Sequence, residues 1–154
     1  MKEHKVVINS CYGGFGVSYS AYMWLKSHGL EKEYLCEDVN ETHIESRKYV
    51  KCVYDENKEL AYVVDAKTPQ THSEDELNKL CHIYIDSDIP RHHPLLVQCV
   101  EELGEKASGP CAKLEIETVY ENNYYITDYD GLERLYEGKP NEYTEGWYTE
   151  YTIE

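Results

Sequence analysis

The sequence predicts an α+β fold, a single domain in which a mostly antiparallel sheet is covered by two helices. The chain has 154 residues, a length that suits one domain and buries about 68–70% of the unfolded chain's surface. Several β-rich segments follow one another directly, which favours antiparallel pairing. Only two well-separated segments have helical periodicity. No internal repeat or linker-like composition divides the chain.

The N-terminal segment predicts a strand, a tight glycine-rich loop and a helix. Residues 4–10 (HKVVINS) are β-branched and apolar, as expected of a short strand, and they lead into the stretch CYGGFGVS. Ser18 is a suitable N-cap for the helix that follows. Gly29 stands where a C′ glycine ends a helix.

The middle of the chain predicts strands and a loop. Two β-rich runs, 49–54 and 60–64, flank the turn-like residues 55–58, so we expect a β-hairpin. Residues 66–76 are polar and contain a proline, which indicates a loop. The sequence CHIYI at 81–85 predicts a further short strand.

The second helix is the clearest element in the sequence. Pro94 suits the first helical position because its φ is fixed and that position needs no backbone donor. Apolar residues at i, i+4, i+7 and i+11 predict one buried face, and Gly109-Pro110 marks the end. Gly104 costs about 1 kcal/mol relative to alanine inside a helix, so we expect close packing there. The face consists of Leu96, Val100, Leu103 and Ala107.

The C-terminal third predicts more strands. Residues 112–119 alternate between apolar and charged, which indicates an antiparallel or edge strand. Residues 124–129 predict another strand before a turn at Asp130-Gly131, and LERLYE at 132–137 has no clear assignment. We therefore separate a compact domain, 1–137, from an acidic, tyrosine-rich tail, 138–154. The tail is an added edge strand, a strand shared with another subunit, or a flexible tail.

Charge and composition exclude several classes of function. Thirty acidic residues against fifteen basic ones give a net charge of −15, which opposes binding to nucleic acid and to anionic membranes. No segment approaches the length of a membrane span, and the N-terminus does not resemble a signal peptide. A cytosolic protein is expected. Its few arginines are Arg47, Arg91 and Arg134.

The six cysteines are scattered without a CxxC pair, so we expect reduced thiols. Their spacing, and that of the histidines, matches no common zinc site, and we predict no metal and no cofactor. Sixteen tyrosines against one phenylalanine provide ring surface together with hydroxyl groups.

The stretch CYGGFGVS has two open interpretations. Backbone N–H groups at a helix N-terminus suit a phosphate or carboxylate, and Gly13, Gly14 and Gly16 would let such a group approach. The stretch is neither GxGxxG nor a P-loop, so the pattern by itself favours a tight turn over an anion site. Cys11 is a candidate nucleophile beside the helix dipole, although small cysteines are more often simply buried.

The second candidate segment is DIPRHHP, residues 88–94. Arg91, His92 and His93 form the densest cationic cluster of the chain, and a guanidinium suits a phosphate. An exposed polar loop paired with Asp86 and Asp88 is the alternative. No pair of carboxylates in the sequence indicates acid–base catalysis.

Three segments resemble a group of short phage and prophage proteins. These proteins begin with VVINxCYGGF and a helix, later carry DIxRxxPxLVxxVEELGxxAxGxxAxLxIxxI, and continue with xxYDGxExxxE. The corresponding segments here are VVINSCYGGFGVS (6–18), DIPRHHPLLVQCVEELGEKASGPCAKLEIETV (88–119) and TDYDGLERLYE (127–137). Residues 30–85 have no counterpart in this group, and an acidic tail replaces its basic-aromatic ending.

The chain also resembles the Thoeris anti-defence sponges. The resemblance implies a small homo-oligomer in the host cytoplasm that encloses a cyclic ADP-ribose-type or cyclic nucleotide signal without cleaving it. Two alternatives stay open: an acidic, DNA-mimicking inhibitor of a host protein, and a small enzyme that uses Cys11. The residues expected to contact a nucleotide-like ligand are Ser10, Tyr12, Gly13, Gly14, Phe15, Gly16, Ser18, Trp24, Arg91, His92 and Arg134.

Overall fold

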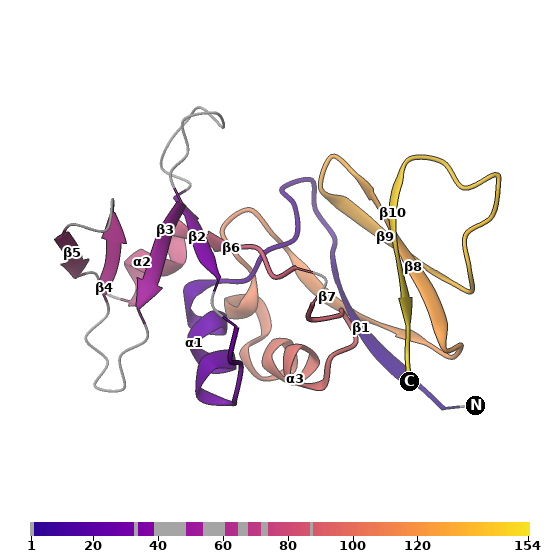
Figure 1. Ribbon diagram of the computed structural model, residues 1–154, viewed down its shortest axis with the longest axis horizontal. Helices are drawn as coiled ribbons and strands as arrows, with labels where there is room; N and C mark the ends of the chain where they lie inside the picture. Colours follow the sequence, from indigo (N-terminus) through magenta and orange to yellow (C-terminus); the bar gives the residue numbers. More distant parts are fainter. Residues whose placement is uncertain are drawn as a thin grey trace.

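The first strand, β1 (His4–Asn9), lies between the helices and the C-terminal strands (Figure 1), and its residues belong to two hydrophobic cores. It pairs antiparallel with β7 (Leu114–Val119). Val7 belongs to one core, whereas Val6 and Ile8 belong to the other. Burial on both faces explains why this strand is a continuous apolar run instead of an alternating one. The computed structural model describes residues 2–32, 34–38, 49–53, 61–64, 68–71, 74–86 and 88–154.

Two helices pack on the first core, and both begin as the sequence predicts. In α1 (Tyr19–Ser27), the N-cap Ser18 accepts a hydrogen bond from the Ala21 N–H, and Gly29 follows the helix with a φ of +108°. In α3 (Pro94–Leu103), Pro94 follows the N-cap residue His93.

The end of the second helix differs from the prediction. Gly104 ends α3 with a φ of +58°, and a short 3-10 turn, η2 (Gly104–Ala107), follows. The expected close packing at Gly104 is wrong, because a Cβ at this position would meet nothing within 4 Å. The glycine is needed for its left-handed backbone conformation.

A five-stranded antiparallel sheet lies at one end of the molecule. Its strands run in the order β5-β4-β3-β2-β6. The predicted pairing of β3 with β4 is confirmed, and the turn predicted at 55–58 lies outside the described residues. The strands are β2 (Leu35–Asp38), β3 (Tyr49–Val53), β4 (Ala61–Val64), β5 (Thr68–Thr71) and β6 (Cys81–Ile83).

The prediction of a loop over 66–76 is wrong. This region contains β5 and the start of a helix, α2 (Glu74–Leu80). Pro69 fits because β5 is an edge strand, where a missing backbone donor is tolerated. Three acidic residues in the first turn of α2 interact favourably with the helix dipole. The strand predicted at 81–85 is confirmed, although it ends at Ile83.

A three-stranded sheet forms the opposite end of the molecule. Its order is β10-β8-β9, with β8 (Asn123–Tyr129), β9 (Leu132–Glu137) and β10 (Trp147–Thr152). Asp130 and Gly131 both have positive φ at the β8–β9 turn, as tight hairpins require. LERLYE, which the sequence left unassigned, is therefore β9. The end of the acidic tail forms β10, an edge strand of the same chain.

The α+β class with mostly antiparallel pairing in one small domain is confirmed. The strands are divided among several sheets instead of forming one. The described strands form sheets of two, three and five strands, and the described helices include α2. Local patterns identify strands but not their partners, which explains the difference. Among the described residues, no helix has the length and apolarity needed to cross a membrane.

Candidate functional site

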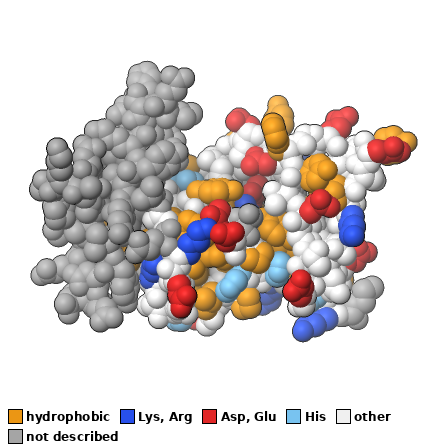
Figure 2. All heavy atoms as spheres, in the orientation of Figure 1, with side chains coloured by type: hydrophobic (Ala, Val, Ile, Leu, Met, Phe, Trp, Pro, Cys, Tyr) orange, Lys and Arg blue, Asp and Glu red, His pale blue; other side chains and the backbone are white. Residues whose placement is uncertain are grey.

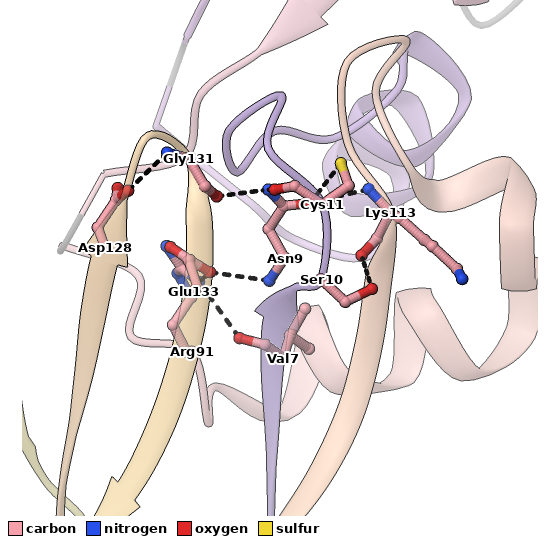
Figure 3. Close-up of polar contacts among 9 residues, drawn as sticks. All are labelled: Val7, Asn9, Ser10, Cys11, Arg91, Lys113, Asp128, Gly131 and Glu133. Carbon is pink, nitrogen blue, oxygen red and sulfur yellow. Dashed lines mark hydrogen bonds and ion pairs between the residues drawn. The ribbon is translucent and has the colours of Figure 1, made fainter.

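A buried ion pair between Arg91 and Glu133 joins the loop before α3 to the C-terminal hairpin (Figure 3). Arg91 Nη1 and Nη2 donate to the two Glu133 carboxylate oxygens at 2.6 and 2.7 Å. Nη1 also contacts the Val7 carbonyl oxygen at 3.3 Å, and the Asn9 backbone N–H donates to Glu133 Oε1 at 2.8 Å. Burial alone would lower the pKa of Arg91, but the hydrogen bonds and charge of Glu133 raise it.

The Asn9 side chain, which is buried, extends this polar junction (Figure 3). Its Nδ2 donates to the carbonyl oxygens of Cys11 and Gly131, at 2.8 and 2.7 Å. Its Oδ1 accepts from the Lys113 N–H at 2.8 Å. One amide side chain thus holds the glycine-rich loop, the β8–β9 turn and the start of β7 together.

The glycine-rich loop is paired with its neighbours at its C-terminal end. Val17 and Ile83 exchange backbone hydrogen bonds of 2.8 and 3.0 Å, and the Gly109 N–H donates to the Gly16 carbonyl at 3.0 Å. The Ser18 N–H donates to the Ala107 carbonyl at 2.9 Å. These backbone contacts hold the C-terminal end of the loop against β6 and residues 107–109.

The loop needs its glycines for close packing. A Cβ at Gly13 would lie 1.6 Å from the Cys111 carbonyl oxygen, and a Cβ at Gly16 would lie 2.1 Å from His82 Nε2. Gly14 has a φ of +94°, which side chains rarely adopt. Internal packing therefore explains the glycines that the sequence associated with an anion.

The first N–H groups of α1 have acceptors within the protein. Ser18 Oγ accepts from the Ala21 N–H at 3.0 Å. Asn78 Oδ1 accepts from the Ser20 N–H at 2.8 Å. These donors are therefore already used, and they do not face an open anion site.

Arg91 and His92, which were expected to bind a phosphate, contact other side chains of the protein instead. Arg91 is engaged by Glu133 as described above. His92 Nδ1 lies 2.6 Å from the Tyr124 hydroxyl, and its ring meets Tyr124 edge-to-face. Burial lowers the pKa of His92, and the charges of His4 and His93 lower it further. His92 is therefore a structural contact to the C-terminal sheet.

Several other predicted ligand residues have structural contacts elsewhere. Ser10 Oγ donates to the Lys113 carbonyl at 3.1 Å, and Ser18 Oγ donates to the Lys106 carbonyl. Trp24, on α1, stacks on His28 with the ring centres 3.7 Å apart. None of these three predicted residues lines the cavities described below.

Tyr12 and Arg134, in contrast, do line a common cavity of about 850 Å³. It lies over the outer face of β8 and β9, where the segment 138–146 between β9 and β10 contributes further walls. An adjoining cavity of about 420 Å³ is lined by Tyr12 and Gly13. The aromatic walls of the larger cavity, named here the outer cavity, are Tyr12, Tyr125, Tyr129, Tyr136 and Tyr143.

Arg134 lies between two aromatic positions of the hairpin. It pairs across the strands with Thr127. On one side, Tyr125 and Tyr136 stack with ring centres 5.2 Å apart and planes 17° apart. On the other side lies Tyr129. Strand alternation places all of these side chains on one face of the sheet.

The outer cavity combines a guanidinium with neutral hydrogen-bonding groups. Arg134 is exposed and takes part in no ion pair recorded for the described residues. Neutral polar groups come from Thr127, Asn141 and Thr144, whereas Asp128 and Glu145 add negative charge. Such a site suits a planar ring system that carries an anionic group and hydroxyl groups.

Residue type and spacing did not identify four of the aromatic cavity residues: Tyr125, Tyr129, Tyr136 and Tyr143. A signal was present in the alternation of YYITDY and LERLYE, which places Tyr125, Thr127 and Tyr129 on the same face as Arg134 and Tyr136 once the hairpin is paired. This signal was missed because LERLYE had no predicted secondary structure. Tyr143 lies in an irregular segment with no comparable pattern.

Cys11 has contacts that do not support nucleophilic catalysis. Its Sγ lies 3.4 Å from Asn9 Oδ1 and 3.3 Å from the Cys111 carbonyl oxygen. Neither group acts as a general base. Within the described part of the chain, no group of three or more His, Cys, Asp or Glu side chains is arranged to hold a metal ion.

Comparison of the chain with protein-family models, with curated proteins and with solved structures found no match.

Proposed function

We propose that this protein captures a small nucleotide-like molecule in the outer cavity and holds it without cleaving it. The observation that carries this proposal is the position of Arg134 between the stacked Tyr125–Tyr136 pair and Tyr129. Aromatic side chains stack on nucleobases, at about 1–3 kcal/mol per base. A guanidinium binds a phosphate through two parallel hydrogen bonds.

The resemblance to Thoeris anti-defence sponges favours a cyclic ADP-ribose-type signal and a location in the host cytoplasm. In this proposal Arg134 binds one phosphate, and Thr127, Asn141 and Thr144 donate to the remaining phosphate oxygens. Glu145 accepts hydrogen bonds from ribose hydroxyls. Arg134 is the one cationic side chain among the residues that line the outer cavity, and the protein has a net charge of −15. The site therefore favours ligands with few phosphates.

Tight capture also requires the ligand to be enclosed. Binding in the micromolar range corresponds to about 8 kcal/mol. Tyr129 and Tyr143, which line the cavity, are 76% and 81% exposed. We propose that a second copy of the chain covers these rings in a homo-oligomer, because burying exposed aromatic surface stabilises an interface.

The direct test incubates the purified protein with cyclic ADP-ribose isomers, removes free ligand, denatures the protein and identifies the released molecules by mass spectrometry. We expect an intact nucleotide. Recovery of no nucleotide, or of a hydrolysed product, would contradict the proposal.

Substitutions inside and outside the outer cavity test whether it is the binding site. Arg134→Ala should weaken binding at least about tenfold, because a hydrogen bond to a charged group contributes roughly 1.5–3 kcal/mol. Tyr125→Leu should weaken it through lost stacking. Lys113→Ala removes an exposed cation just before β7, outside the cavity, and should bind as the wild type does. Equal affinities of Arg134→Ala and Lys113→Ala would show that the outer cavity is not the site.

A further inference from the structure

A second cavity, of about 320 Å³, lies on the inner face of the C-terminal sheet. Inner-face residues of β8, β9 and β10 line it, together with the glycine-rich loop and the segment after β6. Its floor contains the buried Arg91–Glu133 pair. Aromatic rings from three separate parts of the chain converge on this inner cavity: Phe15, Tyr84, Trp147 and Tyr151.

Two of these rings are available to a ligand. Trp147 is 84% exposed and Tyr84 is 60% exposed, although both line the cavity. Large exposed aromatic residues leave apolar surface in contact with water, and a bound molecule would cover it. Figure 2 shows hydrophobic and acidic side chains together on the visible surface at this end of the molecule.

The charges of the inner cavity are unsuitable for an anion. The guanidinium of Arg91 is neutralised by Glu133 at 2.6 Å. Asp86 is paired with Lys32 at 2.7 Å. Asp128 accepts a backbone hydrogen bond at 2.8 Å and has no ion pair recorded among the described residues. One uncompensated carboxylate therefore remains at the cavity.

This carboxylate lies beside the most exposed ring. Asp128 and Trp147 are directly opposed in the pairing of β8 with β10. The same cavity already contains a cation stacked on a ring, because the Arg91 guanidinium lies 3.4 Å from the centre of the Phe15 ring. A carboxylate beside several aromatic faces stabilises a large, weakly hydrated cation.

We propose that the inner cavity binds a small organic cation with a quaternary or alkylated ammonium group. The cationic head lies against Trp147 and Tyr84, and Asp128 balances its charge. Asp128 lines both cavities, but the aromatic rings proposed to contact the two ligands lie on opposite faces of the sheet. Binding of the organic cation is measured without a nucleotide, so its failure is distinguishable from failure of nucleotide capture.

The test uses choline and its neutral isostere 3,3-dimethylbutan-1-ol. In a Trp24→Phe background, Trp147 is the remaining tryptophan of two, so its fluorescence reports on this cavity. We expect a saturable change with choline and at least about twofold weaker binding of the neutral isostere, because cation–π attraction to exposed rings such as Trp147 and Tyr84 is worth about 0.5–1 kcal/mol. Equal binding of the two molecules, or no saturable response, would overturn the proposal.

A pair of matched variants tests the carboxylate. Asp128→Asn keeps an oxygen for the backbone hydrogen bond and removes the charge, and it should weaken choline binding several-fold. Asp130→Asn makes the same change in the adjacent turn, outside the inner cavity, and should leave binding unchanged. Equal losses in both variants would show that overall charge, not this site, attracts the cation. Circular dichroism verifies that both variants are folded.

Discussion

Glu133 is a residue whose main contacts are long-range. It compensates the charge of Arg91, 42 positions away along the chain, and accepts a hydrogen bond from Asn9, 124 positions away. The side chains of Arg91 and Glu133 are only 7% and 4% exposed. Desolvation of a buried ion pair offsets most of its Coulomb attraction. The pair therefore determines how β9 sits on β1 more than it adds net stability.

Removing one partner of this pair should nevertheless be costly. Glu133→Ala leaves the Arg91 charge buried without compensation, and should lower the free energy of unfolding by about 3–5 kcal/mol. Urea unfolding measures the change. The control Glu101→Ala breaks the exposed pair with Lys5, at 3.0 Å, and should cost no more than about 1 kcal/mol. Similar costs in the two variants would contradict the structural role of Glu133.

His92 makes stability depend on pH. Burial and the charges of His4 and His93 lower its pKa in the folded state, below the value of about 6.5 expected when unfolded. Between these two pKa values the unfolded chain binds more protons. The free energy of unfolding therefore falls as the pH drops through about 6.5 toward the folded pKa.

The variant His92→Gln isolates this contribution, because glutamine does not titrate and still offers a hydrogen bond to the Tyr124 hydroxyl. We expect the urea midpoint of the wild type to fall more steeply than that of the variant between about pH 7.5 and about pH 5.5. Parallel pH dependences would show that His92 does not contribute.

At the scale of elements, β10 connects the tail to the second core and to the inner cavity. Tyr151 stacks on Tyr124, with ring centres 4.9 Å apart and planes 14° apart. Trp147, at the other end of the strand, is 84% exposed. The same face of one strand thus has a residue that packs and a residue that is free to bind.

This division predicts different effects for two substitutions in β10. Tyr151→Ala should lower the free energy of unfolding by about 1–3 kcal/mol, through lost stacking and burial. Trp147→Ala should change it by less than about 0.5 kcal/mol. Thermal unfolding followed by circular dichroism compares them. A larger loss from Trp147→Ala would show that this ring supports the fold.

At the scale of the whole molecule, negative charge is the dominant property. The net charge is −15, and Figure 2 shows acidic side chains distributed over the visible face. Several described ion pairs are exposed, including those of Lys5 and Lys113, and these contribute little. Self-repulsion therefore opposes the compact state.

Salt should stabilise this protein. Raising the ionic strength from about 0.01 M to about 0.15 M shortens the screening length from roughly 30 Å to roughly 8 Å. We therefore expect the unfolding temperature to rise with sodium chloride concentration, and potassium chloride, as the control, to act equally. A lower unfolding temperature in salt would mean that attractive ion pairs outweigh the repulsion.

The sequence by itself determined the local elements. The apolar run of β1, the Ser18 cap and Pro94 at the start of α3 depend on neighbouring residues, so period and capping preferences predict them. Candidate residues Tyr12 and Arg134 were also recognised, through residue type. The loop predicted over 66–76 was wrong because part of it pairs with β4 as the edge strand β5. The helix predicted to continue past Gly104 was wrong because this glycine has a positive φ and ends α3.

Only the tertiary structure decided which residues meet. In the folded protein Arg91 is paired with Glu133, and the loop glycines pack against Cys111 and His82. Tyrosines of β8 and β9 lie around Arg134. These contacts join residues far apart in sequence, as when Asn9 donates to Gly131 across 122 positions. Periodicity describes one segment at a time, whereas ion pairs and cavities depend on how separate segments pack.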